Sequence, residues 1–175
     1  RPRTLIRGLE HDWRYLGNEG SRFIWATNRD APRLRIVSLD IAGAVPQPVT
    51  LVAEDKATLD NASIVGGTLI ASYLVDAKTE VRRYSLDGKP LGTLTLPGIG
   101  TATGFEGRPS DPETFFAFTS FASPTTIYRY DARTGASSVW AQPQVAFSPE
   151  AFSVEQRFYQ SKDGTRVPMF LVRKK

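Results

Sequence analysis

Short apolar runs that alternate with polar positions recur along this chain, and they predict β-strands rather than helices. Three of these runs start copies of one arrangement, at Phe23, Leu69 and Phe115. The starts are evenly spaced, since 69 − 23 and 115 − 69 both equal 46. A second run closes each copy on an acid, namely Asp40, Asp87 and Asp131. A repeat near 46 residues is typical of β-propeller blades.

Each copy carries the signals of four short strands. Before the closing acid the side chains alternate, as in Val37-Ser38-Leu39, and a glycine suited to a tight turn follows within four residues (Gly43, Gly88, Gly135). Further runs follow the turns at Pro48–Val52, Leu91–Leu96 and Ser138–Trp140. Other runs precede the copies at Trp13–Leu16, Ala62–Val65 and Thr101–Phe105. No window shows the apolar stripe of a helix, so we expect almost no helix.

The fold class that fits is all-β, a segment of about three four-stranded propeller blades. The runs at Phe23–Thr27, Leu69–Leu74 and Phe115–Phe121 are apolar on both faces, as a sheet stacked between two others requires. A β-sandwich also has many short strands, but the regular period favours the propeller. Three blades do not close a ring, so the chain is either a segment of a larger ring or oligomerises to complete one. Because it begins without Met, we expect the segment.

We divide the chain at the repeat boundaries. Residues 1–8 end a preceding blade, and the three blades are residues 9–54, 55–99 and 100–146. Residues 147–175 form a linker and a C-terminal β-hairpin, because two apolar runs within Gln156–Val172 flank the turn signal Asp163-Gly164. Gln144–Val154 is expected to be the connection, with Pro168 at an edge or non-bonded position of its strand.

The composition narrows the chemistry. The chain is 41% hydrophobic and contains no cysteine and one histidine, which excludes disulfides, thiolate metal sites and a Cys nucleophile. We therefore predict no metal and no cofactor. The net charge of +4 gathers at the two ends rather than on one basic face, so we expect no nucleic-acid partner. No 18-residue apolar run is present, so we expect no membrane partner, and the compartment stays open between cytoplasm and periplasm.

No set of residues in the sequence makes a catalytic centre. A serine nucleophile needs an imidazole, and the only one, His11, is predicted to be exposed in a polar context. No G-x-S-x-G elbow occurs. Two pairs of nearby carboxylates are interpreted as solvated loop acids, Glu54 with Asp55 and Asp111 with Glu113.

Other conspicuous residues are interpreted as structural. The sequon Asn61-Ala62-Ser63 falls in or beside a predicted strand and is not expected to carry a glycan. The glycines at Gly66-Gly67 and Gly98–Gly100 are interpreted as turns, and Asn28-Arg29-Asp30 as a link between the loops of two blades. The aromatic residues are predicted to form inter-blade core, among them Trp13, Trp25, Trp140, Phe116, Phe118, Tyr128 and Tyr130.

Two stretches resemble the prolyl oligopeptidase family of serine peptidases. They are Phe115–Tyr130 and Phe158–Lys175 (FYQSKDGTRVPMFLVRKK), and Asn18–Gly20 with Thr27–Asp40 is similar but weaker. The resemblance implies the last three blades of a seven-bladed propeller, followed by the first hairpin of an α/β-hydrolase domain. Many members have cysteines in these blades, and Ser72 lies in a stretch where they do, so no thiol sensitivity is expected.

The resemblance also implies a function. Family members cleave short peptides after proline with a Ser-Asp-His triad, and the propeller restricts substrates by size. The triad would lie beyond Lys175 and the substrate-contacting propeller residues before Arg1, so no catalytic, cofactor-binding or metal residue is assigned within the chain. The alternatives are a non-catalytic scaffold propeller for protein binding and the propeller of a dipeptidyl or acylaminoacyl peptidase.

Overall fold

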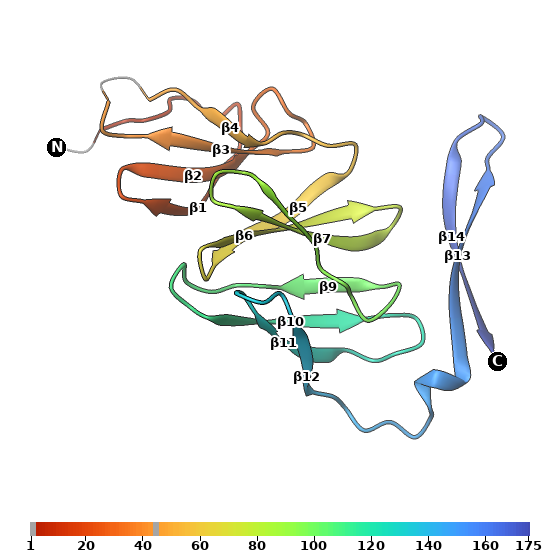
Figure 1. Ribbon diagram of the computed structural model, residues 1–175. Coiled ribbons are helices and arrows are strands. Elements are labelled where there is room, and N and C mark those ends of the chain that lie inside the picture. The colour runs from red at the N-terminus through yellow and green to blue at the C-terminus, as the bar shows by residue number, and fades with distance from the viewer. Residues whose placement is uncertain (1–2, 44–45) are drawn as a thin grey trace.

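Three antiparallel sheets of four strands stack on one another in the computed structural model, and a separate two-stranded hairpin stands beside them (Figure 1). The structure describes residues 3–43 and 46–175. Within them the only helical segment is one short 3-10 turn, η1, at Pro149–Ala151, and no helix is long and apolar enough to cross a membrane. The all-β propeller segment expected from the sequence is confirmed.

Consecutive strands pair in each sheet. The first sheet contains β1 (Trp13–Glu19), β2 (Arg22–Thr27), β3 (Arg35–Asp40) and β4 (Val49–Val52). The middle sheet contains β5 (Thr58–Val65), β6 (Thr68–Val75), β7 (Lys78–Ser85) and β8 (Pro90–Thr93). The third sheet contains β9 (Thr101–Gly104), β10 (Glu113–Thr119), β11 (Thr126–Asp131) and β12 (Ser137–Ala141). Each sheet is therefore a meander of the kind that forms one propeller blade.

Two apolar cores hold the stack together. Residues of the first sheet such as Ile24 and Ile36 pack with Leu69 and Tyr73 of the middle sheet. The other face of the middle sheet packs against the third sheet in a second core. The middle sheet contributes Val65, Ile70 and Val81, and the segment from Phe105 onward contributes Phe105, Phe116, Phe118 and Tyr130. Strand β6 is buried from Thr68 to Tyr73 because both of its faces are covered, as its two-sided apolar sequence predicts.

The third copy is offset by one residue from the predicted alignment. Leu69 faces the sheet before it, and the residue of β10 that does the same is Phe116, whereas Phe115 is 39% exposed on the opposite face. A shift of one residue turns every side chain of a strand to its other face. The copies that are equivalent in space therefore begin 46 and then 47 residues apart, at Phe23, Leu69 and Phe116.

Several predicted element ends also differ. Strand β5 begins at Thr58 rather than Ala62, and β7 ends at Ser85, so Asp87 lies in the turn. Strand β10 ends at Thr119 because the chain turns there, with the Ser120 N–H donating to the Ser123 carbonyl. Gly88 and Gly135 adopt the positive φ expected of turn glycines, but Gly43 does not.

The hairpin consists of β13 (Phe152–Gln160) and β14 (Arg166–Lys174), paired in register around the predicted Asp163-Gly164 turn. The turn is closed by Asp163, which accepts hydrogen bonds from the Ser161 hydroxyl and the Thr165 N–H and whose pKa is thereby lowered to about 2. Pro168 lies opposite Phe158 in a sheet of two strands, where each strand has a free edge, as predicted for a proline. The predicted connection is shorter, because β13 already begins at Phe152.

Candidate functional site

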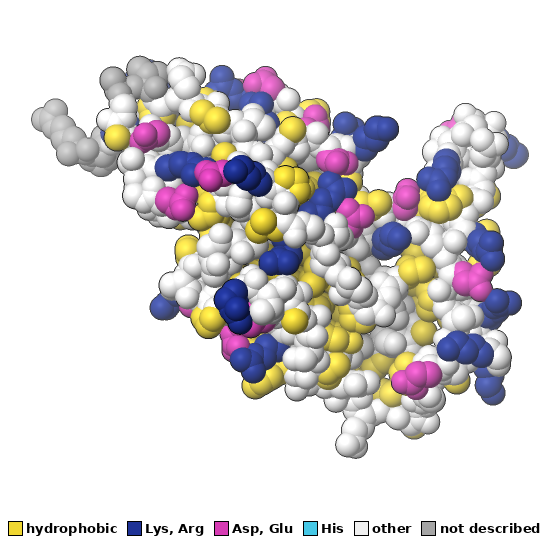
Figure 2. All heavy atoms as spheres, viewed as in Figure 1, with side chains coloured by type: hydrophobic (Ala, Val, Ile, Leu, Met, Phe, Trp, Pro, Cys, Tyr) yellow, Lys and Arg dark blue, Asp and Glu magenta, His cyan; other side chains and the backbone are white. Residues whose placement is uncertain are grey.

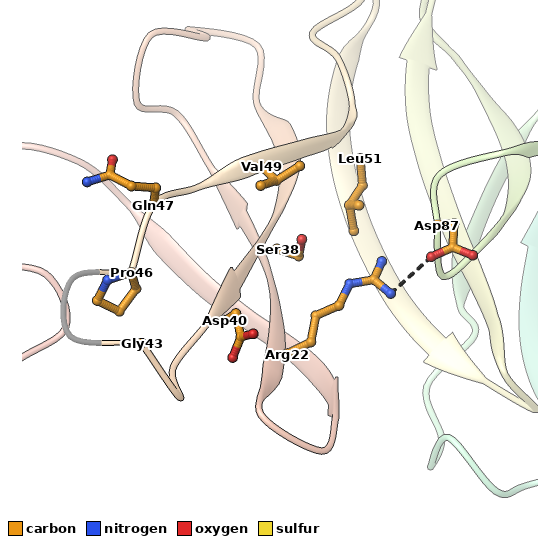
Figure 3. A pocket seen from close by; sticks show the side chains of 9 residues that line it. All are labelled: Arg22, Ser38, Asp40, Gly43, Pro46, Gln47, Val49, Leu51 and Asp87. Carbon is orange, nitrogen blue, oxygen red and sulfur yellow. Dashed lines mark hydrogen bonds and ion pairs between the residues drawn. The ribbon is translucent and has the colours of Figure 1, made fainter.

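A cavity lies where the first and middle sheets meet, between the start of β2 and the β7–β8 turn (Figure 3). Its volume is about 540 Å³. The lining side chains come from β2, β3, the segment into β4 and the β7–β8 turn, and they are Arg22, Ser38, Asp40, Gly43, Pro46, Gln47, Val49, Leu51 and Asp87. A cavity with an arginine, a serine and two carboxylates is the natural place to look for chemistry.

Arg22 crosses this cavity from the first sheet to the middle one. Its guanidinium donates to the Asp87 carboxylate at 3.0 Å (Figure 3). It also donates to the Leu86 carbonyl at 2.5 Å and to Glu19 of its own sheet at 3.1 Å. Its side chain is 28% exposed. These three acceptors engage both terminal nitrogens of the guanidinium. Arg22 therefore serves as a clasp between two sheets.

Asp40 is the second carboxylate that lines the cavity, after Asp87. The Ala42 N–H donates to it at 3.0 Å, and this bond with help from the Ser21 hydroxyl holds the pKa of Asp40 below its usual value. The carboxylate is thus ionised at neutral pH and stabilises the β3–β4 turn. Ser38 has no imidazole among the residues that line the cavity with it. The lining therefore contains no imidazole base that could activate Ser38 as a nucleophile.

The single histidine of the sequence lies elsewhere. His11 is exposed and lines a smaller cavity of about 270 Å³ near the first strand, together with Ile6, Arg7, Gly8, Glu10, Trp13 and Arg29. No serine, threonine or cysteine is among these lining residues, so His11 has no nucleophile to activate there. The exposed histidine predicted from the sequence is confirmed.

The carboxylate pairs are held apart by separate partners. Glu54 accepts the Arg33 N–H at 2.6 Å, whereas Asp55 accepts the Ala57 N–H at 2.9 Å and Arg82 at 3.0 Å, which lowers the Asp55 pKa. Asp111 likewise accepts the Arg108 N–H at 2.7 Å, and Glu113 accepts Arg129 at 2.6 Å. Each acid stabilises a turn or strand, although Glu113 begins β10 and is not in a loop. In the described part of the chain, no group of three or more His, Cys, Asp or Glu residues could hold a metal ion.

Two polar motifs are used within the fold. The Asn61 amide of the sequon donates to Glu106 at 3.0 Å, and Ser63 is buried with its hydroxyl donating to the Phe105 carbonyl at 2.6 Å. The prediction that Asn28-Arg29-Asp30 links two blades is wrong. Asn28 hydrogen-bonds to Asp12, and the Asp30 carboxylate forms ion pairs with Arg29 and Arg35. All of these residues belong to the first sheet or to the segments next to its strands.

The link between blade loops is made by Arg33 instead. The Leu59 N–H of the middle sheet donates to the Arg33 carbonyl at 3.0 Å, and the Arg33 guanidinium donates to the Asp55 carbonyl at 2.8 Å. The sequence contained no signal for it, since an exposed arginine in a loop is unremarkable. Trp140 also departs from prediction, because it is 62% exposed on edge strand β12, while Phe116, Phe118 and Tyr130 are core.

A second candidate region is the seam between the hairpin and the sheets. Two cavities lie along it, of about 450 and 290 Å³. The smaller is lined by side chains of the loops that follow β6, β8 and β10 and by Phe170 of the hairpin. Figure 2 shows hydrophobic side chains at the surface between the sheets and the hairpin, whose tip stands clear of them. The seam offers apolar contact, and neither lining includes a histidine.

Comparison with known proteins identifies the family to which this fold belongs. Residues 1–143 match the family model described as prolyl oligopeptidase, N-terminal beta-propeller domain. A prolyl endopeptidase of Elizabethkingia miricola is 33% identical over 98% of this chain, which covers 24% of that protein. The dual function macrocyclase-peptidase POPB of Amanita bisporigera is 33% identical over 99% of the chain, again covering 24% of the relative. The chain thus spans about a quarter of the length of these relatives.

Solved structures agree in fold. A prolyl endopeptidase analysed for the role of inter-domain dynamics in catalysis and specificity superposes with a TM-score of 0.89 at 42% identity, over 97% of this chain and 25% of that one. Prolyl oligopeptidase B from Galerina marginata, bound to a 35mer hydrolysis and macrocyclization substrate, has a TM-score of 0.84 at 29% identity, over 98% and 24% of the two chains. With sheets, cores and sequence in agreement, this chain belongs to the prolyl oligopeptidase family and corresponds to part of its N-terminal β-propeller domain.

Proposed function

We propose that this chain is the size-selecting propeller portion of a proline-specific serine endopeptidase that cleaves short peptides after proline. Residues 9–54, 55–99 and 100–146 are its blades, residues 1–8 end a preceding blade, and residues 147–175 lead into an α/β-hydrolase domain that carries the triad. The propeller packs on that domain and limits which peptides reach it.

The observation that carries the proposal is the family match together with its end point. The match stops at residue 143, inside the segment between β12 (Ser137–Ala141) and η1 (Pro149–Ala151). Three blades followed by a new hairpin favour an attached enzyme, because a scaffold ring would end on a strand that completes its first blade. The named relatives are endopeptidases or oligopeptidases, which favours this specificity over an exopeptidase.

The test compares the 175-residue chain with the longer protein proposed to contain it. A fluorogenic peptide with an internal proline should be cleaved by the longer protein, and a fluorophosphonate, which phosphonylates an activated serine with loss of fluoride, should abolish cleavage. The 175-residue chain should show no turnover. Cleavage by this chain that the serine reagent blocks, or a longer protein without any post-proline cleavage, would overturn the proposal.

A further inference from the structure

The hairpin lies outside the matched propeller region, yet it contacts two of the sheets. The match ends at residue 143, whereas β13 begins at Phe152. The relatives align with nearly the whole chain, hairpin included. A contact between the hairpin and the sheets is therefore a contact between the propeller and the part of the protein that follows it.

The contacts converge on two loops that join the second and third strands of their sheets. In the β6–β7 turn, the Asp76 carbonyl accepts a hydrogen bond from the Gln156 amide at 2.6 Å, and the Asp76 carboxylate lies 3.9 Å from the Arg166 guanidinium. In the β10–β11 loop, the Phe121 ring lies against Phe170 with centroids 5.2 Å apart. The hairpin thus bridges the middle and third sheets.

The β6–β7 turn has an unusual residue for its conformation. Asp76 and Ala77 both have positive φ, at 48° and 62°, a conformation in which alanine is uncommon and strained. The β5–β6 turn of the same sheet has positive φ at both Gly66 and Gly67, where glycine relieves that strain. The Ala77 side chain lines the 290 Å³ cavity together with Phe121 and Phe170. The Ala77 methyl group therefore lies at the seam in a backbone conformation that glycine would adopt with less strain.

The same contacts are weak and separable. Arg166 and Asp76 are 62% and 42% exposed, and ion pairs so exposed contribute little to stability. The two cavities along this seam are open to solvent, so the hairpin and the sheets are not in contact over the whole seam. A region with few buried contacts opens locally at low free energy. The hairpin is thus docked in a way that allows it to leave.

We propose that the hairpin docked on the β6–β7 turn and β10–β11 loop is a latch, positioned by Asp76, Ala77, Phe121 and Phe170. It sets how readily the domain that follows separates from the propeller, and so how readily long peptides enter. This inference rests on the proposed function and deepens it, because it names the contact that regulates substrate size.

The first test measures docking without using activity. Hydrogen exchange of the full-length protein is followed by mass spectrometry for the wild type, Ala77→Gly and Phe121→Ala. Both variants should exchange several-fold faster at the amides of residues 75–78 and 152–174. Ala77→Gly should do so without lowering Tm, since it removes backbone strain together with the methyl. Leu9→Ala is the matched control, because Leu9 is fully exposed and should change neither region.

The second test measures the consequence for substrates. The value of kcat/KM is compared for proline peptides of about 5 and about 30 residues, and both variants should raise it about threefold or more for the long peptide only. Unchanged exchange in both variants, or equal effects on both peptide lengths, would overturn the latch. A wild-type protein that cleaves neither peptide would overturn the proposed function, while the exchange measurement would still decide whether the latch exists.

Discussion

Arg22 shows how a single side chain can join two sheets whose strands do not pair with one another. It reaches from the first residue of β2 to a turn 65 residues later in the sequence, where the Asp87 carboxylate and the Leu86 carbonyl accept its hydrogen bonds. Charged hydrogen bonds of this kind are shorter and stronger than neutral ones. We therefore interpret the cavity around Arg22 as a gap between the two sheets that Arg22 and Asp87 bridge, and not as a binding site.

Replacing Arg22 by methionine should therefore destabilise the protein by about 1–2 kcal/mol, because the charged hydrogen bonds are lost while the aliphatic stem is kept. Urea unfolding measures the change. Arg29→Met is the matched control: Arg29 is 47% exposed, and its nearest acid, Asp30, lies 3.7 Å away, so the loss should be below about 0.5 kcal/mol. Equal losses in the two variants would show that Arg22 is not a clasp.

No sequence pattern could have identified this clasp. Periodicity locates strands, because burial acts on every second residue, but an arginine at a strand end looks the same whether it is solvated or bonded to another sheet. Arg33 likewise gives no sequence signal of its bonds to the middle sheet. The link between blades was instead predicted at Asn28-Arg29-Asp30, whose polar contacts stay around the first sheet. The assignment of no catalytic residue rests on the sequence alone, which has a single histidine and no serine elbow.

At the scale of elements, strand β10 shows what alternation means in a stack of sheets. Its buried positions are Thr114, Phe116 and Phe118, which face the middle sheet, and Phe115 lies on the opposite face against Trp140. Strand β6 lies in the middle sheet, which has another sheet stacked on each face, and it is buried on both faces. Strand β10 lies in the third sheet, which has another sheet on one face, and it is buried on that face. Two-sided apolar sequence is therefore a property of the strand, and two-sided burial is a property of its neighbours.

This difference predicts unequal costs for the same substitution on adjacent faces of β10. Phe118→Ala should destabilise the protein by about 3–5 kcal/mol, because Phe118 is 4% exposed and its removal leaves a cavity. Phe115→Ala should cost less than about 1 kcal/mol, because Phe115 is already 39% exposed. Thermal or urea unfolding of the two variants measures both. Similar costs would mean that the outer face of β10 is covered as well.

The sequence predicted which segments form strands better than where they begin, and the reason is physical. The runs around Phe23, Leu69 and Phe115 carry the alternation that core burial imposes. The start of β5 at Thr58 was missed because Asp60 and Asn61 interrupt the apolar run. The strand register shifts between Leu59 and Asn61, and Leu59, which is 2% exposed, lies beyond that irregularity. The one-residue offset of the third copy was also invisible, since Phe115 and Phe116 are both aromatic and only the neighbouring sheet distinguishes them.

At the scale of the whole molecule, stability comes from contacts between consecutive sheets. The middle sheet shares one core with each neighbour, as in repeat architectures where each unit contacts only the next. The outer face of the third sheet has no such partner among the described residues. It presents Phe115, Val139 and Trp140 at 39%, 52% and 62% exposure. Apolar surface of this kind usually marks an interface.

The 175-residue chain should therefore self-associate through this face, and Trp140→Glu should reverse the association. A charge cannot enter an apolar interface without losing its hydration, whereas the folded monomer should tolerate it because Trp140 is already largely exposed. Sedimentation velocity gives the oligomeric state, and Leu9→Glu is the control for an added charge at a fully exposed site. Association of Trp140→Glu equal to wild type would place the contact elsewhere. In a longer protein whose next blade covers this face, the same substitution should instead lower Tm, so the two measurements together show whether the face is built for a blade.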